Sequence, residues 1–455
     1  MASIGRIIGI LVVGFLLMSF QQQETDLYKL VNNNGVYYEP NSTIPYTGVG
    51  RSYYDNGTLK VEIPFVSGVE NGVAKYYYES GQLKTETSFK KGVEEGMAID
   101  YYENGEILSI ANFKNAKADA LIRYYYENGN IKKVIRRKNN TEDGVCRYYL
   151  ENGKLDIRAR WKDGKQHGIV QQYNEQGIVT TKVRWRNGRQ DGWSKDYSEK
   201  GKLLAKSHWK KGIADGISKC YYEDGVLQNK RRWKDGDQHG VEKEYYASGK
   251  LFATIAWKNG EKDGLSKYYY EDGKKQRIVN WKAGKQEGVT KDYYKGNRLQ
   301  SVYYFVNDKT EGKATYYFES GVLKGEEEFR DGKRDGKSTY YYSNGIVESR
   351  VNRKKGKLDG IIYFYYENGV LKEEYYYREN KVTGLANQYD VDGDLEKTSE
   401  WENGVLNGIA TYYHKNGCKK IEICYDNGAI KGETKRYDEN GELIVGERTE
   451  NNKQE

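Results

Sequence analysis

The sequence predicts an all-β protein, an elongated antiparallel β-hairpin solenoid built from a 24-residue repeat. A glycine recurs with this period from Gly48 to Gly432, so that seventeen units follow one another without insertion or deletion; Ala120 is the single substitution. A tyrosine stands five positions after each of these residues, from Tyr53 to Tyr437. Between turn signals, short segments show the period-two alternation of strands.

The unit that starts at Gly144 shows how each element follows from its residues. Apolar and charged side chains alternate along residues 155–161, as in a half-buried strand. In most units an Asn-Gly, Asp-Gly or Ser-Gly pair precedes this segment and favours a β-hairpin. A three-residue loop over 151–153, with its glycine left-handed, places Tyr149 opposite Leu155. We therefore expect one apolar face that contains Val145, Tyr149, Leu155, Ile157 and Trp161.

Composition divides the 455 residues into four segments. Arg6 and the mostly apolar residues 7–20 have the charge pattern and length of a signal peptide and are shorter than a membrane-spanning helix. They predict an exported protein that is periplasmic, secreted or envelope-associated. Residues 1–20 would be either a cleaved signal or an N-terminal membrane anchor, and membrane attachment is expected through residues 7–20 only. The other segments are an N-terminal cap (21–45), the repeat array (46–446) and a polar C-terminal tail (447–455).

The composition and the repeat argue against an enzyme. Hydrophobic residues make up 37% of the chain, aromatic residues 14%, and there are 45 tyrosines, which indicates buried rings along a thin sheet. Such a sheet offers few deep pockets, and no acid pair or nucleophile motif breaks the repeat. His167 and His239 occupy the same turn position three units apart and cannot share a metal. We predict no catalytic residues, metal or cofactor.

The four cysteines are predicted to be free thiols. Cys146 and Cys220 lie three units apart, and Cys418 and Cys424 lie six residues apart on one strand. Both separations exceed the roughly 7 Å between Cα atoms that a disulfide tolerates.

Basic residues recur at two positions of the middle units and predict a basic stripe. The net charge of +8 is mild, so their arrangement matters more than their number. One interpretation is a solvated face whose charge is neutralised by turn acids such as Asp143 and Asp191. The other is a binding surface for an acidic protein or an anionic envelope glycan; nucleic acid is not an expected partner of an exported chain. The candidate partner-binding residues are Arg136, Arg160, Arg184, Arg232, Lys138, Lys162, Arg186, Lys210 and Lys234.

Large aromatic side chains form another column, seventeen positions after the first glycine of a unit. Arg137 and Arg353 interrupt it. The structural interpretation is a stacked aromatic spine, which we favour; the functional one is an aromatic platform for sugar rings. The residues to consider for a platform are Trp161, Trp185, Trp209, Trp233, Trp257 and Trp281.

The string W-K-D-G-K-Q-H-G over 161–168, with Y-Y-x-N-G in most units, resembles the MORN repeat. It is more similar to the bacterial variant known as the YwqK-like antitoxin component, and the resemblance covers residues 27–446. It departs from the better-known MORN pattern in its second strand, where Lys182 to Trp185 read K-V-R-W, so the lipid-binding roles of MORN proteins transfer poorly. The resemblance implies a MORN-like hairpin array.

These observations give three hypotheses for function. The first is a non-enzymatic binding scaffold of the bacterial cell envelope that engages protein or glycan partners along its repeat surface. The second is an antitoxin-like or immunity protein that sequesters a toxin; a patch that breaks the repeat, around Arg137 and Asn140 or around Arg353, would favour it. The third, a carbohydrate-active enzyme, would need an acid pair in a pocket.

Overall fold

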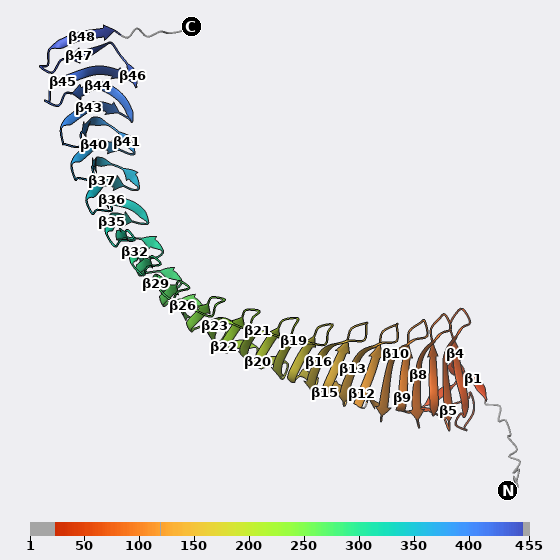
Figure 1. The fold of residues 1–455 in the computed structure, drawn as a ribbon. Coiled ribbons are helices and arrows are strands. Elements are labelled where there is room, and N and C mark those ends of the chain that lie inside the picture. Colours follow the sequence, from red (N-terminus) through yellow and green to blue (C-terminus); the bar gives the residue numbers. More distant parts are fainter. Residues whose placement is uncertain (1–22, 119, 449–455) are drawn as a thin grey trace, which may run out of the picture. The chain divides into compact units, whose positions relative to one another are not determined.

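The computed structural model describes residues 23–118 and 120–448, which form two compact units: 23–202 (without 119) with 210–212, and 203–209 with 213–448. We call these unit 1 and unit 2. The fold is an all-β array of antiparallel hairpins, as predicted, and Figure 1 shows how one hairpin follows another. The predicted signal or anchor, 1–20, lies outside the described residues. Within the described part of the chain, no helix is long and apolar enough to cross a membrane.

The strands of unit 1 begin at Glu24 and follow the predicted period. They are β1 (Glu24–Asp26), the 3-10 turn η1 (Leu27–Lys29), β2 (Val31–Asn33), β3 (Val36–Tyr38), β4 (Gly48–Tyr53), β5 (Leu59–Val66), β6 (Val69–Glu70), β7 (Gly72–Tyr77), β8 (Leu83–Lys90), β9 (Val93–Tyr101), β10 (Ile107–Lys114), β11 (Lys117–Ala118), β12 (Ala120–Tyr125), β13 (Ile131–Lys138), β14 (Thr141–Glu142), β15 (Gly144–Tyr149), β16 (Leu155–Lys162), β17 (Lys165–Gln166), β18 (Gly168–Tyr173), β19 (Val179–Arg186) and β20 (Arg189–Tyr197).

The strands from β21 onward lie in unit 2, apart from Lys210, the last residue of β21. They are β21 (Leu203–Lys210), β22 (Ile213–Tyr221), β23 (Leu227–Lys234), β24 (Asp237–Gln238), β25 (Gly240–Tyr245), β26 (Leu251–Lys258), β27 (Glu261–Lys262), β28 (Gly264–Tyr269), β29 (Lys275–Lys282), β30 (Lys285–Gln286), β31 (Gly288–Tyr293), β32 (Leu299–Val306), β33 (Lys309–Thr310), β34 (Gly312–Tyr317), β35 (Leu323–Arg330), β36 (Lys333–Tyr341), β37 (Val347–Lys354), β38 (Lys357–Leu358), β39 (Gly360–Tyr365), β40 (Leu371–Arg378), β41 (Lys381–Val382), β42 (Gly384–Tyr389), β43 (Leu395–Glu402), β44 (Val405–Tyr413), β45 (Lys419–Asp426), β46 (Ala429–Ile430), β47 (Glu433–Tyr437) and β48 (Leu443–Arg448).

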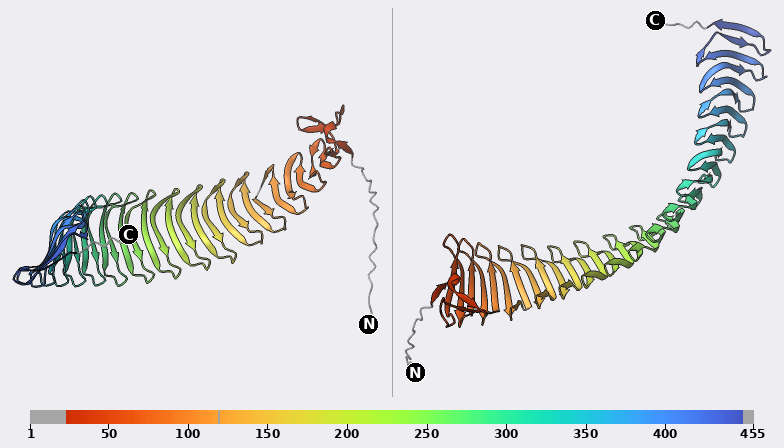
Figure 2. Two further views of the ribbon diagram at one scale, coloured as in Figure 1. Left: turned by 90° about the horizontal axis from the view of Figure 1, so that it is seen from above. Right: turned by 180° about the vertical axis from the view of Figure 1, so that it is seen from behind.

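The hairpin of β15 and β16 has the predicted three-residue loop. Tyr149 pairs with Leu155, and the Leu150 amide donates to the Lys154 carbonyl at 2.8 Å. Gly153 closes the loop by donating to the Leu150 carbonyl at 2.9 Å. Its φ of +80° is left-handed, a conformation that glycine adopts without steric cost. Views from two further directions show the same hairpin recurring within each unit (Figure 2).

The prediction of one apolar face is wrong for three of its five residues. Cys146 pairs with Ala159, and Val145 pairs with Arg160, so adjacent residues of β15 point to opposite faces. Val145 and Tyr149, together with Leu155, the partner of Tyr149, therefore lie on the face opposite Ile157 and Trp161. A β-bulge causes the difference, because Tyr148 pairs with Ile157 while Tyr149 pairs with Leu155, leaving one residue of β16 unpaired. We call the face with Cys146 and Trp161 the inner face, and the face with Val145 and Arg160 the outer face.

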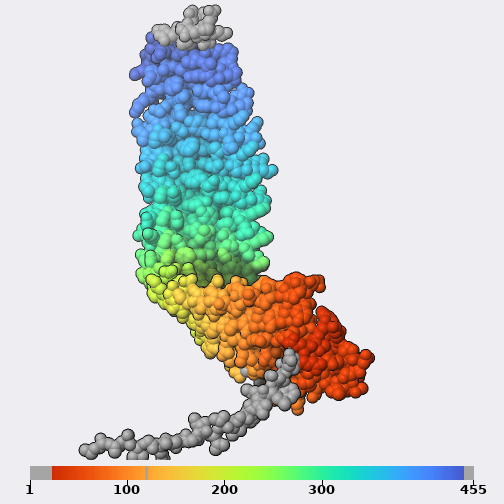
Figure 3. Space-filling view, turned by 90° about the vertical axis from the view of Figure 1, so that its right-hand side faces the viewer, coloured from red at the N-terminus to blue at the C-terminus, as the bar shows by residue number. Residues whose placement is uncertain are grey.

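In many repeats a tyrosine hydroxyl bonds to the backbone of the next repeat. The Tyr126 hydroxyl donates to the Tyr149 carbonyl at 2.8 Å, and Tyr246 donates to Tyr269 at 2.7 Å. The same bond recurs from Tyr54, Tyr78, Tyr102, Tyr222, Tyr270, Tyr294, Tyr342 and Tyr366. These bonds satisfy strand-end carbonyls and explain why the sequence repeats two adjacent tyrosines. Side chains of successive repeats form a continuous surface along unit 2 (Figure 3).

The ends of the array are built differently from its middle. At the start, β1 pairs in parallel with β4, and Leu30 and Tyr46 pack in a buried cluster with Phe65. Residues 23–46 thus cover the edge of the first hairpin, where an open strand would otherwise invite pairing. At the other end, β48 runs to Arg448, two residues into the segment predicted as a tail.

Candidate functional surfaces

All nine residues of the predicted basic stripe are exposed on the outer face. Seven of them lie in unit 1; Arg232 and Lys234 lie in unit 2. Within the described residues, none of the nine takes part in an ion pair. The turn acid Asp143 instead faces a backbone amide, that of Asp163, at 3.5 Å.

Three stripe arginines of unit 1, Arg136, Arg160 and Arg184, each lie against the glycine that begins the following repeat. An added Cβ on Gly168 would lie 3.1 Å from the Arg160 Cδ, and one on Gly192 would lie 2.9 Å from the Arg184 Cδ. The arginine stem therefore lies directly against the glycine, while the guanidinium extends into solvent. The recurrent glycine therefore has two roles: it adopts a positive φ, and without a Cβ it leaves room for the arginine stem.

Basic side chains line a shallow depression between the hairpins of β15/β16 and β18/β19. Its volume is about 610 Å³, and no carboxylate lines it. Val145 and Ile169 contribute apolar surface, and Gln171 lies 3.5 Å from the Arg158 guanidinium. The four basic side chains that line it are Arg158, Arg160, Lys182 and Arg184.

The sequence prediction included Arg160 and Arg184 but missed Arg158 and Lys182. Each missed residue stands two positions before a predicted arginine on the same strand, so the two share a face. Strand periodicity could therefore have identified both. A row of exposed apolar residues beside the arginines was also missed because it was assigned to the apolar face; it includes Val73, Met97, Leu121, Ile169 and Trp193.

The tryptophan column lies on the inner face, and its six rings are half-buried. Trp233 donates from Nε1 to the Ser218 hydroxyl at 2.8 Å, and Trp257 donates to Glu242 at 2.9 Å. In unit 1, Trp161 packs against a buried cluster that contains Ile135 and Cys146. The rings thus cover the inner side of the sheet. All four cysteines are free thiols, and burial raises the pKa of Cys146.

Unit 2 carries buried ionised groups on its inner face. Glu327, which is 2% exposed, accepts hydrogen bonds from Tyr316 at 2.8 Å, Arg334 at 2.9 Å and Tyr340. Burial acts to raise the pKa of Glu327, but the bonds from Tyr340, Arg334 and Tyr316 outweigh it and lower that pKa. Burial and Glu327 raise the pKa of Tyr340. The described residues contain no group of three or more His, Cys, Asp or Glu placed to hold a metal.

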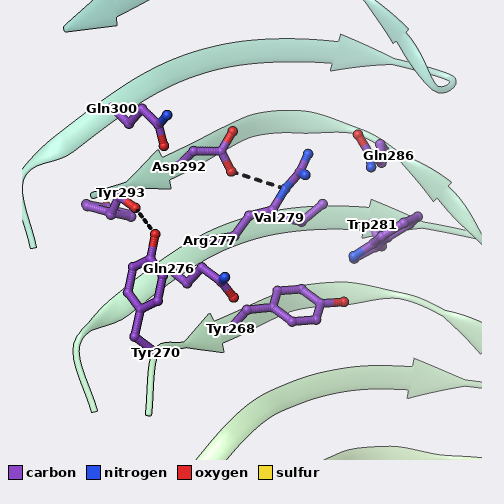
Figure 4. A pocket seen from close by; sticks show the side chains of 10 residues that line it. All are labelled: Tyr268, Tyr270, Gln276, Arg277, Val279, Trp281, Gln286, Asp292, Tyr293 and Gln300. Carbon is purple, nitrogen blue, oxygen red and sulfur yellow. Dashed lines mark hydrogen bonds and ion pairs between the residues drawn. The ribbon is translucent and has the colours of Figure 1, made fainter. Parts of the chain in front are cut away.

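A second depression, of about 470 Å³, lies on the inner face of β28, β29 and β31 (Figure 4). Tyr268 and Trp281 supply aromatic rings, and Arg277 Nε lies 3.3 Å from Asp292 Oδ1. Side-chain amides complete the polar lining, from Gln276, Gln286 and Gln300.

Comparison with known proteins identifies the repeat. Eleven segments match the MORN repeat variant, and together they cover more than half of the chain. This chain belongs to the MORN repeat variant family. The matched segments are 46–67, 70–91, 94–115, 119–139, 142–163, 214–235, 238–259, 262–283, 310–331, 334–355 and 358–379.

Other comparisons add little to this family assignment. No curated protein matches the chain. Among solved structures, the crystal structure of TcdB2-TccC3 is 11% identical over 92% of this chain and 30% of that chain, with a TM-score of 0.13. The Photorhabdus luminescens Tc holotoxin pore is 11% identical over 90% of this chain and 28% of that chain, with a TM-score of 0.14. This chain thus spans less than a third of either, and these TM-scores carry no argument.

Proposed function

We propose that this MORN repeat variant protein is a non-enzymatic binding scaffold of the bacterial cell envelope that holds an anionic glycan along the outer face of unit 1. The depression with four basic side chains and no carboxylate carries the proposal. The cations there are not consumed by internal ion pairs, so their charge is available to a ligand. Export through residues 1–20 is part of the same proposal and would place the scaffold where such glycans occur.

The periodicity of the surface supports an extended ligand. One repeat adds two strands, so the arginine column advances by about 9.6 Å per unit. A polymer with regularly spaced carboxylates or phosphates can contact several arginines at once, which raises its apparent affinity without a deep pocket. The exposed apolar row beside the arginines would contact the uncharged parts of the same ligand.

The experiment compares binding of polygalacturonate and of neutral dextran by the purified chain at low and high salt. We expect polygalacturonate binding that weakens steeply with salt and no dextran binding at this surface. In the double variant Arg160→Ala/Arg184→Ala the affinity should fall about tenfold or more. The matched control Lys250→Ala/Lys295→Ala removes the same charge from exposed hairpin loops of unit 2 and should bind normally. Equal loss in both variants would contradict the proposal.

The alternative is an antitoxin-like protein that sequesters a toxin, and one observation favours it. Arg137 and Arg353 replace aromatic residues of the spine, and the Nε atom of each is enclosed without a hydrogen-bond acceptor among the described residues. These two positions interrupt the repeat locally, as a patch for a single protein partner would. Cross-linking of the chain to envelope extract decides between the two functions, because recovery of one protein in stoichiometric amount, lost in Arg137→Ala, would favour the antitoxin.

A further inference from the structure

We propose that the inner-face depression of unit 2, built around Tyr268 and Trp281, binds a pyranose ring of a neutral carbohydrate. This site is separate from the anionic-glycan surface, since it lies in another unit and on the opposite face. It therefore goes beyond the proposed function and can fail or succeed independently of it.

The first argument is the pairing of aromatic rings with planar polar groups. A pyranose has an apolar face of C–H groups, which suits the negative face of an aromatic ring, and a rim of hydroxyls that need donors and acceptors. Tyr268 and Trp281 supply rings that lie near each other, as Figure 4 shows. Gln276 and Gln300 offer amide donors and acceptors at its hairpin end.

The second argument is electrostatic. The charged groups that line the depression are Arg277 and Asp292, whose contact at 3.3 Å cancels their net charge, and the Lys262 ammonium lies 4.7 Å from the Trp281 ring centroid. Anionic and cationic ligands would each have to disrupt this pair, whereas neutral hydroxyls can bond to both partners without disrupting it. The lining thus favours a neutral ligand, in contrast to the four cations on the outer face of unit 1.

The third argument concerns donors that the protein does not satisfy. Among the described residues, the Trp281 indole N–H has no acceptor, and the hydroxyls of Ser266 and Thr290 on the same face are also without partners. Leaving such a group buried and unbonded costs about 1 to 3 kcal/mol. Trp161 and Trp185 lack an acceptor in the same way, whereas Trp233 and Trp257 find acceptors in Ser218 and Glu242. The Trp281 N–H is therefore a donor that the protein leaves unbonded beside the depression.

The test uses the full chain with three neutral hexasaccharides: cellohexaose, maltohexaose and chitohexaose. Saturation-transfer NMR detects contact, and calorimetry gives the affinity. We expect at least one hexasaccharide to bind. Trp281→Ala should lower its affinity about tenfold. Asp292→Asn should also lower the affinity, although the asparagine side chain has nearly the same shape as aspartate. The matched control is Trp185→Ala, because Trp185 occupies the same register position but Gln172 and Thr181 stand where Tyr268 and Arg277 do.

Three results would overturn this inference. In the first, no hexasaccharide receives saturation from the protein. In the second, Trp185→Ala loses as much affinity as Trp281→Ala. In the third, polygalacturonate competes with the hexasaccharide, and Trp281→Ala no longer binds polygalacturonate. Asp292→Asn keeps the test valid if Trp281→Ala fails to fold. Arg160→Ala/Arg184→Ala should leave hexasaccharide binding unchanged, so failure of this site and failure of the outer surface are distinguishable.

Discussion

Ile135 in unit 1 and Glu327 in unit 2 occupy the same position of the repeat, and both are 2% exposed. Ile135 packs in an apolar cluster with Ile122 and Cys146. Glu327 is instead surrounded by hydroxyl and guanidinium donors, those of Tyr316, Tyr340 and Arg334. The backbone frame therefore fixes how deeply a residue is buried, while the neighbouring repeats determine whether an apolar or an ionised side chain is stable there.

The outer face shows the same contrast. Arg160 in unit 1 and Glu400 in unit 2 both stand next to the glycine of the following repeat. Arg160 extends past Gly168 into solvent, whereas Glu400 accepts a hydrogen bond from the Ile409 amide at 3.1 Å. One side chain is presented to a ligand, and the other is bonded within the protein. Equivalent positions of a repeat protein thus need not share a function.

The largest expected effect comes from removing Glu327. In Glu327→Ala the half-buried hydroxyls of Tyr316 and Tyr340 and the exposed Arg334 guanidinium lose their acceptor, and we expect the free energy of unfolding to fall by about 3 kcal/mol. Urea denaturation of the full chain measures the change. Glu326→Ala is the control, since its neighbouring carboxylate is only half-buried. An equal loss in both variants would contradict the role of the cluster.

Ile135, which occupies the repeat position of Glu327, should affect stability through packing alone. Ile135→Ala deletes fully enclosed atoms and leaves a cavity, so we expect a loss of about 2.5 kcal/mol in urea denaturation. Ile135→Val should lose less than half of that. If Ile135→Ala were neutral, the cluster of unit 1 would not stabilise the fold.

Low pH should destabilise the strands around Glu327 in unit 2 more than those around Ile135 in unit 1. The pKa of Glu327 is lowered in the folded state, so its contribution to stability is complete above the unfolded value of about 4.3 and disappears as pH falls through the folded value. Hydrogen exchange of β35 should therefore accelerate below about pH 4 relative to β13. The difference should vanish in Glu327→Gln.

The tyrosine bonds between repeats should each contribute less. Tyr246→Phe removes the donor to the Tyr269 carbonyl, and we expect a loss of about 1 kcal/mol in urea denaturation. Tyr245→Phe is the matched control, because within the described chain the Tyr245 hydroxyl makes no hydrogen bond. Equal values for the two variants would show that the bond does not stabilise the stack.

The smallest effect on stability should come from the outer face. Glu400→Arg replaces an exposed carboxylate by the arginine found at this position in unit 1, and we expect the free energy of unfolding to change by about 0.5 kcal/mol. If the arginine column binds anionic glycans, the variant should also gain affinity for polygalacturonate, measured by calorimetry. Glu400→Gln, which adds no charge, should show no gain.

The sequence alone determined the period, the hairpins and the three-residue loop, because turn geometry and strand alternation are local properties. It also identified the basic stripe, since a fixed period aligns the residues sixteen and eighteen positions after the first glycine of each unit in two rows.

Only the tertiary structure decided which face each row occupies. A β-bulge shifts the strand parity by one residue, which placed Val145 and Tyr149 opposite Trp161 and exposed the apolar row beside Arg160. The tertiary structure also decided why Ile135 is buried among apolar side chains and Glu327 among hydrogen-bond donors, because these neighbours come from adjacent repeats. The inner-face depression with Tyr268, Trp281 and the Arg277–Asp292 pair likewise depends on strands that meet across repeats, which no local pattern encodes.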